Sequence, residues 1–239
     1  MDCFSERVSE TASTVAARPI RSYVLRQGRM TDAQQRALVE LWPRYGLAVP
    51  EHQLDLPGSF GNPNPVTLEI GFGNGEALAE NAARFPQRNY LGIEVHGPGV
   101  GALMLRLDQQ QSRNVRILQT DAMELLRRHI PAAALQAVLL FFPDPWPKKK
   151  HHKRRIVQTE FAELVQRALI PGGLVHMATD WEDYARQMLE VFSHAPGFVN
   201  IAGMGNYAPR PDSRTLTKFE RRGQRLGHGV WDLIFERTD

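Results

Sequence analysis

A carboxylate beside a dense run of positive charge is the clearest chemical feature of this chain. Asp144 lies between two prolines, at the end of the apolar stretch 137–142, and Trp146 follows it. Six of the eight residues in 148–155 are lysine or arginine, and the other two are histidine. Charge runs are usually solvated faces, but a run tethered to a strand end favours a polyanion held over a reaction centre. Trp146 offers a flat face to a stacked base, unless it is buried in the core.

A glycine-rich turn follows the apolar stretch 66–70 and carries acids on both sides. Gly71 and Gly73 begin a run with glycine at every second position, which permits a tight turn close to a ligand. A dinucleotide fingerprint needs a third glycine where this chain has Glu76. Glu69 and Glu76 repel a diphosphate but suit a cation, and S-adenosylmethionine is a cation without phosphate. The alternative is a turn that only eases packing between strand and helix.

Further acids follow the other predicted strands. Glu94 closes the stretch 90–94, where an acid can accept hydrogen bonds from both ribose hydroxyls. Asp121 follows the stretch 115–119, and it could accept from an adenine amine or cap the next helix. Asp180 follows the fifth strand and could also be a helix N-cap. Acids at the ends of successive strands predict a nucleoside site without phosphate recognition.

Apolar stretches alternate with helical patterns along most of the chain. We predict strands over 66–70, 90–94, 115–119, 137–142, 174–178, 198–201 and 230–236. We predict helices over 76–84, 100–111, 122–129, 156–169 and 181–194. This alternation predicts an α/β fold with a doubly wound, mainly parallel sheet. Ligands bind outside the carboxyl ends of such strands, so the residues just after each strand are the ones expected to carry the chemistry.

Composition is that of an ordinary globular protein. The chain has 239 residues, with 42% hydrophobic and 23% charged, so we expect one main domain over residues 51–239 behind a flexible basic extension over residues 1–50. The single cysteine, Cys3, excludes an intrachain disulfide and a Cys-based metal site, and no metal is expected. No signal-peptide core is present, and the longest apolar run, 132–142, is too short to span a bilayer. These features predict a cytoplasmic protein that does not enter a membrane.

The extension itself is predicted to be mostly irregular. The first 20 residues mix Ser, Thr, Ala and charges without periodicity, which is typical of a mobile tail. Thr31 or Asp32 is expected to cap a short helix that Pro43 ends. Residues 50–65 are rich in Pro, Gly and Asn, which indicates a linker or loop.

The segment Pro-Asp-Pro-Trp-Pro-Lys-Lys with its basic tail makes this chain similar to a known family. The chain resembles the bacterial tRNA (guanine-N7-)-methyltransferases from about residue 66 onward, and more loosely from residue 21. The resemblance rests on 68–73, 92–96, 142–155, 178–181, 217–220 and 225–233. The Pro-Asp-Pro-Trp segment is highly specific to the family, whereas the glycine loop is shared with many methyltransferases. Thr215 departs from the pattern, because relatives often carry proline there.

The resemblance implies a class I methyltransferase with a Rossmann-like, seven-stranded sheet. It implies methyl transfer from S-adenosylmethionine to N7 of a guanine in the tRNA variable loop, with S-adenosylhomocysteine as product. The methyl donor would be bound by Glu69, Gly71, Gly73, Glu94, Asp121 and Asp144, and Asp144 would also be the catalytic acid. Substrate contacts would come from Lys148, Asp180, Thr217, Lys218, Phe219 and Glu220. RNA contacts would come from Lys150, His151, His152, Lys153, Arg154 and Arg155.

The partner implied is tRNA, bound by a monomer or homodimer without an obligatory protein partner. The guanine would be unstacked, with Trp146 or Phe219 holding it. An amino-group methyltransferase acting on DNA or protein is the first rival, but those enzymes often place two prolines before an aromatic, whereas here prolines flank Trp146. A non-catalytic RNA-binding module is the second, and the intact row of acids argues against it. Glu76 disfavours a dinucleotide oxidoreductase.

Overall fold

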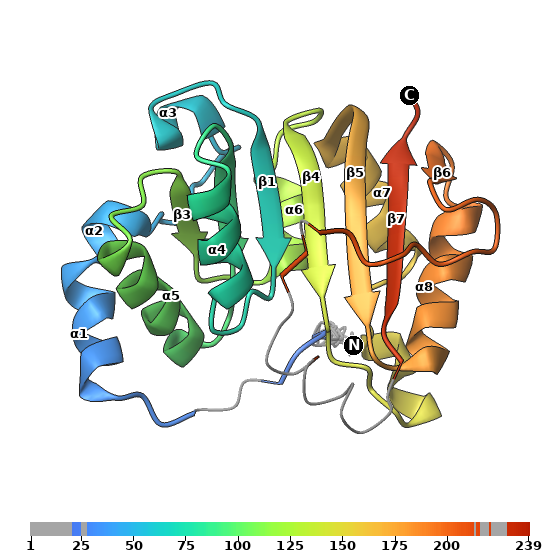
Figure 1. The fold of residues 1–239 in the computed structure, drawn as a ribbon, viewed down its shortest axis with the longest axis horizontal. Helices are drawn as coiled ribbons and strands as arrows, with labels where there is room; N and C mark the ends of the chain where they lie inside the picture. The colour runs from blue at the N-terminus through green and yellow to red at the C-terminus, as the bar shows by residue number, and fades with distance from the viewer. Residues whose placement is uncertain (1–20, 25–27, 213, 216–219, 221–228) are drawn as a thin grey trace, which may run out of the picture.

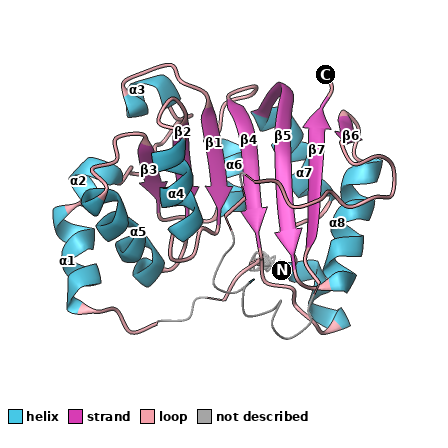
Figure 2. Cartoon of the chain, viewed as in Figure 1, coloured by secondary structure: helices cyan, strands magenta, loops and turns pink. Residues whose placement is uncertain are grey.

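A seven-stranded sheet lies between two layers of helices (Figures 1 and 2). The computed structural model describes residues 21–24, 28–212, 214–215, 220 and 229–239. The strand order is β3-β2-β1-β4-β5-β7-β6, with β1 to β5 parallel and β7 antiparallel to β5 and β6. The predicted α/β class and its mainly parallel sheet are therefore confirmed.

The predicted elements are found within a few residues of their expected bounds. The strands are β1 Val66–Ile70, β2 Asn89–Ile93, β3 Val115–Leu118, β4 Leu135–Phe141, β5 Leu169–Thr179, β6 Phe198–Asn200 and β7 Trp231–Arg237. The helices of the sheet layers are α4 Glu76–Arg84, α5 Gly97–Gln109, α6 Ala122–Arg128, α7 Thr159–Ala168 and α8 Glu182–His194. All five residues of β1 and of β2 are buried, because helices cover both faces of these central strands.

Short helices lie where the sequence predicts only a loop or the end of a helix. Asp55 accepts a hydrogen bond from the Gly58 N–H at 3.0 Å and so caps α3, Leu56–Phe60, inside the expected loop. Pro43 does not end the first helix but lies in the first turn of α2, Trp42–Tyr45, where a missing N–H costs nothing. Before it, α1 runs over Asp32–Glu40 with Thr31 as its predicted N-cap.

The helices α1 and α2 belong to the core of the main domain. Ala37 and Tyr45 are buried in one hydrophobic cluster with Leu103 of α5. The backbone N–H of Leu47 donates to the carbonyl of Ile117 in β3 at 2.8 Å. The predicted boundary near residue 50 therefore does not coincide with a break in packing, whereas residues 1–20 lie outside the described part of the chain.

Two kinds of feature are absent from the described residues. None of their helices is long and apolar enough to cross a membrane. No group of three or more His, Cys, Asp or Glu side chains among them is placed to hold a metal ion.

Candidate active site

Carboxylates follow five neighbouring strands at one edge of the sheet. The order β3-β2-β1-β4-β5 brings together the residues at or just past the carboxyl ends of these strands, which point toward the bottom of Figure 1. In that order the acids are Asp121, Glu94, Glu69, Asp144 and Asp180. The strand order turns a set of acids scattered over the sequence into one acidic rim.

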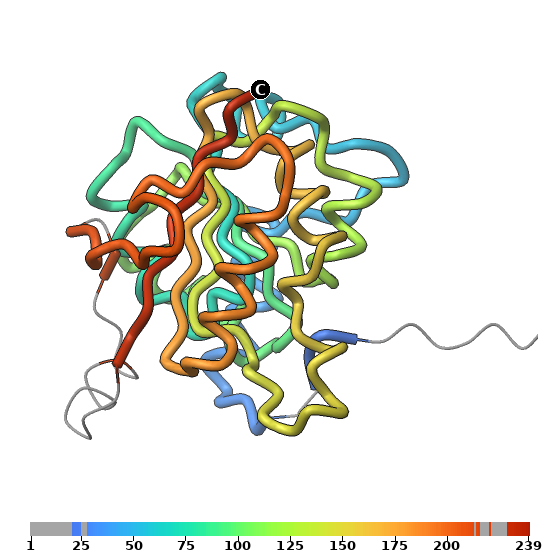
Figure 3. The backbone as a smooth tube through the Cα atoms, turned by 90° about the vertical axis from the view of Figure 1, so that its right-hand side faces the viewer, coloured from blue at the N-terminus to red at the C-terminus, as the bar shows by residue number. Residues whose placement is uncertain are grey.

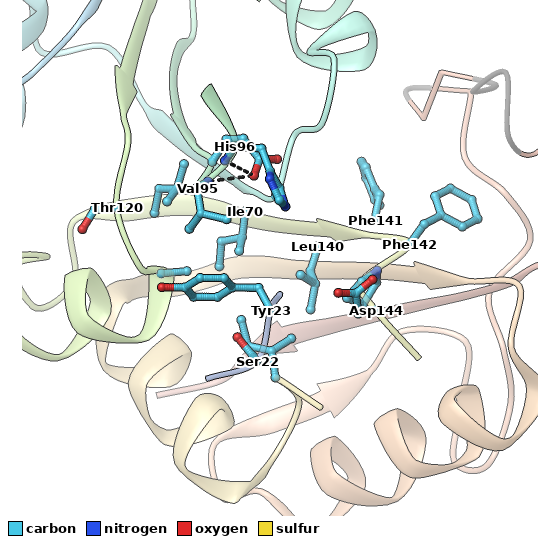
Figure 4. Close-up of a pocket in the computed structure, with 16 residues that line it drawn as sticks. Ser22, Tyr23, Ile70, Val95, His96, Thr120, Leu140, Phe141, Phe142 and Asp144 are labelled. Atoms are coloured by element: carbon cyan, nitrogen blue, oxygen red, sulfur yellow. Dashed lines mark hydrogen bonds between the residues drawn. The ribbon is translucent and has the colours of Figure 1, made fainter. Parts of the chain in front are cut away.

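A cavity opens in the middle of this rim, and Figure 4 shows its lining. Of the predicted donor-binding residues, Gly71, Glu94 and Asp144 line it directly. Asp121 lines an adjoining hollow on the side of α6. Glu69 is not part of the described lining but lies buried behind Gly71, at the end of β1.

Glu94 organises the backbone around the cavity. Its Oε2 accepts a hydrogen bond from the Gly73 N–H at 2.9 Å, and its Oε1 accepts from the N–H groups of Val95 at 2.7 Å and His96 at 3.0 Å. These bonds tie the glycine turn after β1 to the turn after β2. Because a carboxylate offers about four lone-pair sites, Glu94 keeps acceptor capacity for one further donor.

The glycine turn leaves open space where other residues would place side chains. Gly71 has φ +70° and Gly73 has φ +57°, and a Cβ added to either would meet no atom within 4 Å. The left-handed backbone explains why glycine is used here, and the missing side chains leave room for a ligand against the turn. Glu76 begins α4 and puts a carboxylate at the helix end that a pyrophosphate would need.

Glu69 is a buried acid with an unpartnered oxygen. Glu69 is 3% exposed, and its Oε2 has no hydrogen-bond partner among the described residues. Burial raises the pKa of Glu69 from 4.5 to about 8, so the neutral form is favoured near neutrality. A cationic ligand group beside Oε2 would favour the charged form and lower this pKa.

Glu69 should make the protein less stable as pH rises. The folded pKa of Glu69, about 8, lies above the ordinary value of 4.5. The contribution of Glu69 to the free energy of unfolding is therefore fully present below about pH 4.5 and is lost as the pH rises through 8. The free energy of unfolding should fall by up to about 1.4 kcal/mol per pH unit in this window, and Glu69→Gln should remove that fall. Urea unfolding followed by circular dichroism at several pH values measures it. The exposed Glu80→Gln is the control, and equal slopes for both variants would contradict the prediction.

Asp121 and Asp180 differ in their local roles. Asp121 is the N-cap of α6, and its Oδ1 accepts from the Glu124 N–H at 3.0 Å. Asp180 is not a helix cap, because Trp181 is the N-cap of α8 and no side chain caps that helix. The Asp180 carboxylate is exposed at the sheet edge instead, as a substrate contact requires.

The loop that carries Asp144 is held in an unusual backbone conformation. Phe142 has φ +52° and Trp146 has φ +45°, a region that non-glycine residues rarely adopt. The Phe142 N–H donates to the Ala178 carbonyl at 2.8 Å, which ties the loop to β5. Such conformations persist where the surroundings impose them, and they concentrate at functional sites. Asp144 itself is exposed between these two residues.

The basic run forms a 3-10 helix, η1, over Lys149–Arg154, with no buried residue. The side chains of Lys148, Lys149, Lys150 and Lys153 are exposed. His151 packs edge-on against the Trp146 ring, with centroids 5.9 Å apart. Arg154 lies over the same ring at 3.9 Å from its centroid. Arg154 thus occupies one side of the Trp146 ring, which is partly exposed, and the role of Trp146 as a base-stacking face stays a prediction.

Arg155 also departs from its predicted contact with RNA. The residue is 2% exposed, and its Nε donates to the Pro145 carbonyl at 2.8 Å. Its two terminal nitrogens donate to Gln187 Oε1 at 2.7 Å and Asp183 Oδ2 at 2.6 Å. With its donors directed inward, Arg155 fixes the Asp144 loop on α8, and a phosphate could reach it only by breaking these bonds.

Glu220, predicted to touch substrate, lies in a buried ionic cluster instead. Arg214 is 2% exposed and its two terminal nitrogens each lie 2.7 Å from a Glu220 carboxylate oxygen. The Arg214 Nε lies 2.7 Å from Asp232 Oδ1, and His176 Nε2 lies 2.7 Å from the same oxygen. Asp232 belongs to β7 and His176 to β5, so the cluster joins Glu220 to the sheet. Thr217, Lys218 and Phe219 lie outside the described residues.

Comparison with known proteins identifies the family. A family model described as "Putative methyltransferase" matches residues 63–233. The tRNA (guanine-N(7)-)-methyltransferase of Hydrogenovibrio crunogenus is 57% identical over 220 residues, which are 92% of this chain and 92% of that protein. The protein of the same name from Pseudomonas aeruginosa is 56% identical over 222 residues, 93% of this chain and 91% of the relative. The chain belongs to the tRNA (guanine-N(7)-)-methyltransferase family.

Solved structures agree with the fold of this family. The antibiotic-resistance methyltransferase Kmr matches with a TM-score of 0.52 at 16% identity, covering 82% of this chain and 98% of that structure. An rRNA methylase from Streptococcus thermophilus matches with a TM-score of 0.50 at 12% identity, covering 80% of this chain and all of that structure. At such low identity the likeness shows the fold alone, and it confirms the predicted Rossmann-like class I methyltransferase sheet.

Some residues that line the cavity of this tRNA (guanine-N(7)-)-methyltransferase family member were not predicted from the sequence. Ser22 and Tyr23 line the cavity from the N-terminal side, and His96 lines it from the turn after β2. In the sequence, Tyr23 is an aromatic residue within a sparse stretch of arginines, and this pattern does not by itself indicate a ligand site. The sequence also did not indicate that Arg214 is buried, because no local pattern connects it with Glu220 or with Asp232 in β7.

Proposed function

We infer that this chain methylates tRNA, transferring a methyl group from S-adenosylmethionine to N7 of a guanine in the variable loop. The observation that carries this inference is the cavity that Glu94 and Asp144 share at the acidic sheet edge, next to a hollow that the exposed Lys153 lines. Its relatives at 57% and 56% identity carry the name of this activity over nearly their whole length. We place the reaction in the cytoplasm, by a monomer or homodimer without an obligatory protein partner.

The cavity residues fit a donor with cationic groups and no phosphate. The open space at Gly71 and Gly73 would admit the donor against the turn, and the remaining acceptor site of Glu94 suits a ribose hydroxyl. The unpartnered Oε2 of Glu69 suits an ammonium group. The acids at the ends of the strands that flank β1 favour positive charge and disfavour the diphosphate of a dinucleotide.

Asp144 has the position of an orienting and electrostatic group. When bound, S-adenosylmethionine supplies a methyl group on a sulfonium, whose positive charge appears on the purine once the methyl is bonded to N7. Guanine N7 already holds an in-plane lone pair, so no residue need remove a proton before attack. The Asp144 carboxylate can stabilise the charge that develops on the purine and accept hydrogen bonds from the guanine amine or imino groups. Its imposed loop backbone keeps the carboxylate in place for this task.

The exposed lysines supply the grip on tRNA. Lys148, Lys149, Lys150 and Lys153 can contact phosphates without reading sequence. Arg154 occupies one side of the Trp146 ring, so a guanine stacked on Trp146 would have to lie on the other side. Phe219 lies outside the described residues, and Trp181 is 40% exposed beside Asp180 at the same sheet edge. Either aromatic offers a face for stacking.

Methylation of unmodified tRNA tests the function directly. The full chain is incubated with tRNA and methyl-labelled S-adenosylmethionine, and the product is reduced and treated with aniline, which cleaves the strand at 7-methylguanine. We expect label in tRNA and one cleavage site in the variable loop. Label without cleavage would place the methyl on another atom. Label in duplex DNA or protein, with none in tRNA, would favour the amino-group methyltransferase.

A further inference from the structure

The segment Arg21–Val24, called the strap here, is distant in sequence from the other cavity residues yet forms part of the cavity wall. Ser22 and Tyr23 line the same cavity as Asp144. Figure 4 shows both residues across the cavity from His96. Figures 1 and 3 both place the dark-blue strap beside the yellow loop that follows β4. The strap is therefore positioned to contact whatever the cavity binds.

The side chains of Trp146 and Arg154 hold the strap through its backbone carbonyls. The Trp146 indole Nε1–H donates to the Ser22 carbonyl at 3.0 Å. Arg154 donates from Nε to the Arg21 carbonyl at 3.1 Å and from a terminal nitrogen to the Tyr23 carbonyl at 3.5 Å. The guanidinium also lies over the Trp146 ring, 3.9 Å from its centroid. Three consecutive strap carbonyls thus accept bonds from one stacked pair of side chains.

Tyr23 connects the strap to the acidic rim. Burial, together with the negative charge of the nearby Asp121 carboxylate, raises the pKa of the Tyr23 hydroxyl. Asp121 lines the hollow next to the cavity, and Tyr23 lines both. The phenol ring thus extends from the cavity to this rim acid. A ring in that position offers an apolar face to a flat nucleoside base.

We propose that the strap completes the donor site, with Tyr23 contacting the nucleoside part of the donor and with Arg154 and Trp146 as positioning residues that hold it. This inference rests on the proposed function, because it takes the donor to be S-adenosylmethionine. Arg154 then contributes to donor affinity without touching the donor. Its guanidinium is committed to the strap, whereas the neighbouring Lys153 is exposed and free to serve tRNA.

Donor binding without tRNA separates this role from a phosphate contact. S-adenosylhomocysteine is titrated calorimetrically into the full chain and into Arg154→Ala, with Lys153→Ala as the control that removes one neighbouring charge. We expect Arg154→Ala to raise the Kd roughly tenfold or more, since it loses charge-assisted hydrogen bonds, and Lys153→Ala to leave it within about twofold. Trp146→Phe, which keeps the ring but loses the bond to Ser22, should raise the Kd less. Thermal unfolding verifies that each variant is folded.

Each result decides the proposal. An unchanged or lower Kd for Arg154→Ala overturns it, the latter because the strap would then obstruct the donor. If Arg154→Ala fails to fold, Trp146→Phe and Tyr23→Ala carry the test, and unchanged Kd values for both overturn it. Tryptic cleavage after Arg21 gives a second readout: S-adenosylhomocysteine should slow it in the unsubstituted chain and not in Arg154→Ala. No binding to the unsubstituted chain would contradict the proposed function itself, whereas binding with an unchanged Arg154→Ala overturns the strap alone.

Discussion

Replacing Asp144 by asparagine should lower the rate of methyl transfer about 100- to 1,000-fold, the range typical of losing one preorganised electrostatic group in a transition state. The change keeps the shape of the side chain and a carbonyl acceptor, but it removes the negative charge that faces the purine as positive charge develops. Single-turnover rates with saturating tRNA and saturating donor measure this chemical step without the binding steps. Near-normal turnover by Asp144→Asn would contradict an electrostatic role.

The Asp144 effect must be separated from weaker donor binding and from unfolding. Asp144 lines the donor cavity, so the Kd for S-adenosylhomocysteine should be measured for the variant. A defect that disappears when the donor is saturating belongs to donor binding and not to the chemical step. Because Asp144 is exposed, its replacement should leave the free energy of unfolding within about 0.5 kcal/mol of the original. Asp108→Asn, near the C-terminal end of α5 and outside the cavity lining, is the control for both measurements, and its partly exposed pair with Arg44 should be worth less than about 1 kcal/mol.

The acidic rim could be predicted from the sequence because two local patterns coincide. Apolar stretches mark the buried strands, and the residue after each strand is known once the strand is known, so Glu94 and Asp144 could be assigned directly. Strand order could not be read from these patterns. That β1 lies between β2 and β4, which sets Glu94 and Asp144 on either side of Glu69, depends on crossover connections that only the structure reveals.

The different roles of the individual residues in the basic run could not be predicted, because they depend on the run forming a helix with three residues per turn. In η1, His151 and Arg154 are three residues apart and both face Trp146. Lys150 and Lys153 are also three apart, and both are exposed. Arg155, the C-cap, turns inward. The positive charge is uniform along this segment of the sequence, whereas the fold divides the segment into an exposed side and a side that contacts the protein.

Contacts between distant residues explain the remaining differences. Arg154 and the strap carbonyls that it binds are more than 130 positions apart, so no local pattern connects them. Glu220 was assigned to substrate through the resemblance of its segment, which does not distinguish a residue that touches the guanine from one that fixes the segment. Its 3% exposure and its pairing with Arg214 favour the second role. The predicted substrate contacts of Thr217, Lys218 and Phe219 lie outside the described residues.

Replacing Arg214 by methionine should lower the free energy of unfolding by about 3–5 kcal/mol, the usual cost of removing one partner from a buried ion pair. Arg214 lies between Glu220 and Asp232, and all three residues are at most 3% exposed. Methionine fills much of the arginine volume but leaves two buried carboxylates without their cation. Urea unfolding measures the loss. Arg186→Met is the control, because its pair with Glu182 is exposed on α8 and should be worth less than about 1 kcal/mol.

The cause of the loss can be separated into charge and packing by neutralising the acids as well. If unpaired charge is responsible, Arg214→Met combined with Glu220→Gln and Asp232→Asn should recover part of the free energy of unfolding, since buried uncharged groups cost less to desolvate. If the shape of the arginine matters more, the triple variant should be less stable than the single one. His176, 2.7 Å from Asp232, would keep a polar partner in the triple variant. A recovery in stability without recovery of methyl transfer would then show that activity depends on the charged groups of this cluster beyond their effect on folding.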